Sequence, residues 1–157
     1  MKRNRTMRIA TPLMLALALT PAIARAECQP SDETVRVRVR LQPAANLQVA
    51  GFVMSVAYPA DELVIPGKGK EAAESAVSKM PAGAFTGSDD REGEIRLVVA
   101  KAEALALDPV CEITFHRCQG AKKAEARAVS CKVTDASDPS TNKIKLDDLK
   151  CVVGAAS

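Results

Sequence analysis

The side chains best suited to chemistry are five cysteines and a single histidine. His116 lies two residues before Cys118. Residues at this spacing in a strand point the same way but sit about 7 Å apart, which is poor geometry for a nucleophile and its base. His116 also alternates with the apolar Ile113 and Phe115, so we expect it to face solvent. Because no zinc-binding or nucleophile motif accompanies it, we predict that the protein is not an enzyme.

Carboxylates form the next candidate sites. The acidic clusters are Asp89-Asp90 with Glu92 and Glu94, and Asp147-Asp148. A looser set of oxygen ligands is Asp135, Asp138 and Asn142. Paired carboxylates could support a small secreted hydrolase, and the looser set could bind structural calcium. Neither has EF-hand spacing, and Asp and Asn are common turn residues, so solvated turns are the preferred interpretation and no cofactor is predicted.

The five cysteines allow two disulfides and one free thiol, in 15 arrangements. Cys131 and Cys151 would lie opposite each other if the last two strands pair about a loop near Thr141. They are our disulfide candidate, and Cys111 with Cys131 is the competing choice. Cys28, near the start of the mature chain, is the candidate for the unpaired thiol and could cross-link to another chain.

Residues 1–26 have the features of a secretory signal peptide. Four basic residues in 2–8 precede an apolar run over 9–24, and Ala24-Arg25-Ala26 forms a small-x-small cleavage site. The alternative is a membrane anchor, but the run is short and contains prolines. Lipid attachment at Cys28 fits poorly after the charged Glu27. We predict cleavage after Ala26 and a secreted or periplasmic product.

Cleavage would change the charge. The whole chain has 22 basic and 19 acidic residues, a net charge of +3, but five basic residues lie in the leader. The remaining 27–157 has 17 basic against 19 acidic residues, so its net charge is −2. This removes the reason to expect nucleic acid as a partner. We expect contact with a membrane only through the signal peptide before its cleavage. Disulfides are expected in an exported chain.

Alternating polarity dominates the chain after the leader. In 34–41, valines and Leu41 fall on one face while Arg36, Arg38 and Arg40 fall on the other. This predicts a half-buried strand whose arginines are either a solvated face or a face for an acidic partner. Further strands are predicted over 48–58, 63–65, 94–100, 110–117, 126–134 and 143–153, with a short helix before Pro81 and a loop at 87–90. The pattern predicts one all-β sandwich domain over 27–157.

Aromatic residues are too few for a sugar-stacking platform. The rings after the leader are Phe52, Tyr58, Phe85 and Phe115, and three of them fall on predicted core faces. Polar recognition of a glycan stays open.

Several segments, in order, resemble cohesin-type modules. Ala50-Gly51-Phe52, Tyr58-Pro59 and Leu63-Val64-Ile65 are similar to the early core of that family. Gly93 to Val99, Cys111 to Phe115, and Val133 to Ser137 followed by Asn142-Lys143-Ile144 are similar to its middle strand, next core strand and final hairpin. The resemblance covers about 35–153. Tyr58-Pro59 departs from the more usual Tyr-Asp-Pro, and the cysteines are not a family feature.

The resemblance implies a two-sheet jelly-roll β-sandwich of about nine strands, with at most one short helix. It also implies a non-enzymatic module that recognises a protein partner, such as a dockerin-like one, through a sheet face. The same fold group includes polysaccharide-binding modules, which are the alternative function. Arg36, Arg38 and Arg40 are the candidate partner face.

Overall fold

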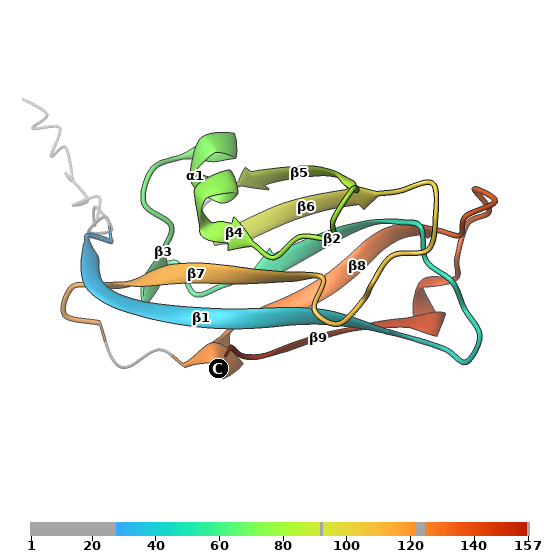
Figure 1. Ribbon diagram of the computed structural model, residues 1–157. Coiled ribbons are helices and arrows are strands. Elements are labelled where there is room, and N and C mark those ends of the chain that lie inside the picture. Colours follow the sequence, from blue (N-terminus) through green and yellow to red (C-terminus); the bar gives the residue numbers. More distant parts are fainter. Residues whose placement is uncertain (1–27, 92, 122–124, 157) are drawn as a thin grey trace, which may run out of the picture.

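The computed structural model describes residues 28–156 except 92 and 122–124 (Figure 1). The predicted signal peptide, residues 1–26, and Glu92 of the first acidic cluster lie outside the described residues.

The described chain forms two antiparallel sheets packed face to face (Figure 1). Sheet A has the order β3-β7-β1-β9, with β4 also paired to β7. Its strands are β1 (Pro30–Pro43), β3 (Leu63–Val64), β4 (Val77–Ser78), β7 (Cys111–Cys118) and β9 (Leu149–Ala155). Sheet B has the order β5-β6-β2-β8. Its strands are β2 (Gly51–Ala57), β5 (Phe85–Asp90), β6 (Glu94–Ala100) and β8 (Ser130–Ser137). The predicted two-sheet β-sandwich of nine strands is confirmed.

The core lies between the sheets and follows the alternation in the sequence. In β1, Val35, Val37, Val39 and Leu41 are buried. β7 of the same sheet contributes Ile113 and Phe115, which are fully buried. The facing residues come from β2 and β6 of sheet B, and the fully buried ones include Met54, Val56, Ile95, Leu97 and Val99. Because side chains alternate along a strand, each strand that buries these residues turns the residues between them outward.

Two different elements close the sides of the sandwich. The single α-helix, α1 (Gly69–Ala76), packs against β4 and β7 of sheet A and against β5 of sheet B, with Ala72, Ala73 and Ala76 buried. On the other side, the edge strands β8 and β9 are joined by the Cys131–Cys151 disulfide. Short 3-10 helices η1 (Ala126–Ala128) and η2 (Leu146–Asp148) precede these two strands.

One predicted loop is a strand. Residues 87–90 belong to β5, which pairs with β6 from Phe85 opposite Ala100 to Asp90 opposite Ile95. Gly, Ser and Asp have low strand propensity, so the local sequence resembles a turn. The pairing with β6 overrides that preference.

The predicted pairing of the last two strands is wrong. β8 pairs with β2, and β9 pairs with β1, so the two strands belong to different sheets. The bridge between Ser137 and Lys143 is isolated, and residues 126–128 and 146–148 are helical turns rather than strand. Cys131 and Cys151 therefore meet across the sandwich rather than along a hairpin.

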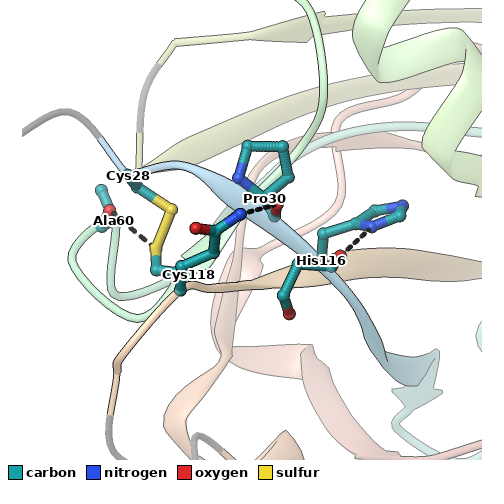
Figure 2. The surroundings of a disulfide bond; sticks show 7 residues. Cys28, Pro30, Ala60, His116 and Cys118 are labelled. Carbon is teal, nitrogen blue, oxygen red and sulfur yellow. Dashed lines mark hydrogen bonds between the residues drawn. A yellow bond between two sulfur atoms is a disulfide. The ribbon is translucent and has the colours of Figure 1, made fainter.

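The suggestion that Cys28 is the unpaired cysteine is also wrong. Cys28 is bonded to Cys118, with a Cα–Cα distance of 5.1 Å (Figure 2). The reason is the register of sheet A, in which Pro30 of β1 lies opposite Cys118 of β7. The Gln119 side-chain amide also donates to the Pro30 carbonyl, at 3.3 Å. The segment that leads into β1 is thereby tied to the end of β7.

Candidate binding faces

The cysteines offer no reactive thiol at the surface. The favoured pair, Cys131 and Cys151, forms one disulfide, Cys28 and Cys118 form the other, and Cys111 is free and buried. Burial raises the pKa of the Cys111 thiol to about 12, and the nearby Glu112 carboxylate adds to the effect. Because the thiolate is the nucleophilic form, this thiol is chemically inert in the folded chain.

His116 lies at the same end of sheet A as the Cys28–Cys118 disulfide (Figure 2). Its Nδ1 is 2.8 Å from the Ser31 carbonyl oxygen, to which it donates a hydrogen bond. The Cys118 sulfur is bonded to Cys28. His116 and Cys118 therefore form no nucleophile–base pair, and the ring holds the start of β1 against β7.

The two acidic clusters lie at opposite ends of the sandwich. Asp89 and Asp90 pair with the start of β6, next to the end of β2. Asp148, at the end of η2, lies at the other end, where its carbonyl accepts a hydrogen bond from the amide of Ala44, which follows β1 in the segment leading to the start of β2. A hydrolytic site built from both clusters is therefore not assembled. Asp89 instead pairs with Arg91 at 3.1 Å.

The loop that could have bound calcium is closed by its own hydrogen bonds. The Asp138 carboxylate accepts from the amides of Ser140 and Asn142, and from the Asn142 side chain. These bonds, led by the one from the Asn142 side chain, hold the pKa of Asp138 below its usual value. Asp135 lies 3.9 Å from the Lys143 ammonium instead. No group of three or more His, Cys, Asp or Glu side chains within the described ranges could hold a metal ion.

The outer face of sheet A carries the arginine row predicted from sequence. Arg36 and Arg40 are exposed, whereas Arg38 is engaged by Glu112 of β7 through two hydrogen bonds, at 3.2 and 3.0 Å. Lys79, after β4, contacts the second oxygen of Glu112 at 2.9 Å. Hydrogen bonds from Lys79 and Arg38 hold the pKa of Glu112 below its usual value. The centre of this face is thus an ion-paired cluster joining β1, β7 and the segment after β4.

The outer face of sheet B is different, because three strands turn small or apolar residues toward solvent. Val53 of β2 and Val98 of β6 are opposite each other, and Gly51 is opposite Ala100. They line a shallow concavity of about 250 Å³, which we call the Val53–Val98 groove. Its other lining residues are Phe52, Val99, Asp135, Ala136, Ser137, Thr141 and Lys143.

Phe85 lies beside the groove, on the edge strand β5. It pairs with Ala100 and is 72% exposed, the most exposed large apolar side chain within the described part of the chain. The opposite wall is formed by Thr141 and Lys143 of the loop that Asp138 holds closed. An exposed apolar side chain beside an apolar groove with polar residues around it makes this face a candidate binding surface.

Sequence reasoning selected the arginine row and missed the Val53–Val98 groove. The missing signal was present as runs of three apolar residues, Phe52-Val53-Met54 and Leu97-Val98-Val99. In a half-buried strand the middle residue of such a run must face solvent. Phe85 gave no comparable signal, because its strand was not predicted.

Comparisons with protein-family models, curated proteins and solved structures found no match for this chain. Among the described residues, no helix is both long and apolar enough to cross a membrane. Two disulfides within the described residues fit an oxidising compartment.

Proposed function

We propose that this protein is a secreted, non-enzymatic binding module, similar to cohesins, that recognises a protein partner through the outer face of sheet B. The predicted leader and the two disulfides support export.

The resemblance to cohesins gains support from where the quoted segments fall. Gly51-Phe52 begins β2, Leu63-Val64 is β3, and Cys111 to Phe115 is the first part of β7. The segments at 93–99 and 133–137 cover nearly all of β6 and the second half of β8. Most of the residues that carry the resemblance are thus strand residues of one sandwich. Tyr58-Pro59 and Asn142-Lys143-Ile144 lie outside the strands, and the expected final hairpin is absent because β8 and β9 pair with different strands.

The observation that carries the proposal is the Val53–Val98 groove beside Phe85. Protein interfaces depend on a few apolar or aromatic anchors surrounded by polar residues. Phe85 is such an anchor, at 72% exposure, and Asp135 and Lys143 are polar residues at the groove. A partner side chain seated between Val53 and Val98 would exclude water from both.

The test is binding by charge-inserted variants. The oxidised chain 27–157 is used as bait on secreted proteins from its own organism, and each captured protein is purified and titrated calorimetrically. Val98→Glu places a carboxylate in the groove and should weaken binding about a hundredfold. The matched control is Val152→Glu, which makes the same change on sheet A, where Val152 lies opposite Arg40.

Equal weakening by the two variants, or no effect of Val98→Glu on a saturable complex, would contradict the assignment to sheet B. The near-ultraviolet spectrum and the urea midpoint of each variant show whether a loss of binding reflects unfolding instead.

A further inference from the structure

The outer face of sheet A carries several positive charges without an ion pair among the described residues. Arg36 and Arg40 of β1 have no ion pair within the described ranges, and neither has Lys150 of β9. Lys150 lies opposite Gln42, and residues directly opposite in an antiparallel pair share a face. The Glu112 carboxylate is shared between Arg38 and Lys79. Five cations thus share one face with one carboxylate bound among them.

Arg36, at one end of the row, also lines a concavity of about 520 Å³. Arg117 and Arg127 line the same concavity, and Arg117, opposite the buried Leu63, belongs to the inward side of β7. Arg127 pairs with Glu125 at 3.1 Å, and the Nε of Arg117 pairs with Glu33 at 3.3 Å. The Nη1 of Arg117 is buried with no hydrogen-bond partner among the described residues. Because this atom is buried, a ligand does not reach it, and Arg36 is the guanidinium at the concavity that has no ion pair within the described ranges.

We propose that this face, from the concavity along β1 to Arg40, binds a linear anionic polysaccharide through its carboxylate or sulfate groups. Alternate residues of a strand are about 7 Å apart, so Arg36, Arg38 and Arg40 form a straight row of guanidinium groups. A guanidinium matches the two oxygens of a carboxylate or sulfate with parallel hydrogen bonds. A row of such groups suits a chain that repeats its charge along its length.

The composition of the face favours a glycan over a protein or a lipid surface. The exposed large apolar residues of the described chain are Phe85, on sheet B, and Leu146, in η2, so the strands of sheet A present no such anchor. Protein interfaces usually need one. Overall charge would not attract a polyanion, because the chain after the predicted cleavage site has a net charge of −2. Attraction to a polyanion must come from the local row.

The experiment uses the oxidised chain 27–157 and two matched double variants. Arg36→Gln with Arg40→Gln removes two charges from sheet A. Arg96→Gln with Lys132→Gln removes two charges from the outer face of sheet B, where both residues are opposite Ser55. Probes are polygalacturonate for carboxylates, dextran sulfate for sulfates and neutral dextran as control, titrated by calorimetry at low and moderate salt.

We expect saturable binding to at least one charged polymer and none to neutral dextran. The sheet A double variant should lose at least about tenfold in affinity and show a weaker salt dependence, whereas the sheet B variant should lose less than about twofold. No saturable binding, or equal loss in both variants, would overturn the proposal. Equally tight binding to polyglutamate or to vesicles rich in phosphatidylserine would overturn the choice of a glycan.

Discussion

The two outer faces both come from strands whose side chains alternate between core and solvent, but the outward residues differ in kind. On sheet A, the outward residues of β1 are arginines, and a buried carboxylate from β7 ties the middle one in place. On sheet B, the outward residues of β2 and β6 include Val53 and Val98, and the neighbouring edge strand adds Phe85. One face is therefore equipped for charge recognition and the other for burial of apolar surface.

The difference teaches that the position of a residue in a strand does not reveal whether its side chain is free to contact a partner. Arg38 alternates in the sequence like Arg36 and Arg40, yet it is held by Glu112. Val98 alternates like a polar surface residue, yet it offers an apolar contact. The ion pair with Glu112 holds the Arg38 side chain in place, whereas the half-buried Val98 side chain can be covered further by a partner.

The largest expected effect is on the disulfides that hold the two faces in one body. Chain-entropy theory relates the stabilisation to the length of chain closed, which is 90 residues for Cys28–Cys118 and 20 for Cys131–Cys151. Replacing both cysteines of a pair with alanine should lower the free energy of unfolding by about 4.5 and about 3 kcal/mol, respectively. Urea denaturation followed by circular dichroism measures both. The opposite order would mean that strain or residual structure outweighs loop closure.

A smaller effect is expected from removing the carboxylate at the centre of sheet A. The native pKa of Glu112 is below its ordinary value of 4.5, so its ion pairs add stability above that pH. This contribution is lost as the pH falls through the native pKa. The stability of Glu112→Gln should therefore change less between pH 6 and pH 3 than that of the unaltered chain.

The same change would sharpen the contrast between the faces. Freeing Arg38 and Lys79 should tighten binding to polygalacturonate by about tenfold at low salt and leave partner binding at sheet B unchanged. Glu103→Gln, which removes the exposed partner of Lys101, is the control. Equal tightening in the control would indicate a response to net charge alone.

The smallest expected effect on stability is at the edge of the groove. Phe85→Ala should change the free energy of unfolding by less than about 0.5 kcal/mol, because the side chain is 72% exposed. The same variant should weaken binding of the sheet B partner by more than about tenfold. A large loss of stability would mean that Phe85 packs onto the sheet and is not an anchor for a partner.

Much of the fold could be predicted from local pattern. The strand expected over 94–100 has the observed bounds of β6, and the alternation in 34–41 identified the buried and exposed faces of β1. β5 was missed because Gly, Ser and Asp carry turn preferences. The pairing of β9 with β1, in place of the expected pairing with β8, was missed because local sequence does not encode which strand becomes a neighbour.

The candidate sites, like the fold, have some features that local sequence predicts and others that depend on the order of the strands. Alternation alone placed the arginine row on one face, and the apolar runs around Val53 and Val98 could have placed the groove on another. The groove itself needs residues of β2, β6 and β8 side by side, and the pairing of Arg38 with Glu112 joins residues 74 apart in sequence. These outcomes depend on strand order.

The amino-acid sequence by itself determined which residues of a strand such as β1 or β6 are buried, because a period of two follows from backbone geometry. It also favoured the Cys131–Cys151 disulfide, which the structure confirms. Only the tertiary structure decided that Cys28 pairs with Cys118, that one arginine of the row is engaged, and that the apolar groove lies on the opposite sheet. These features depend on contacts between distant segments, which form only when the two sheets pack together.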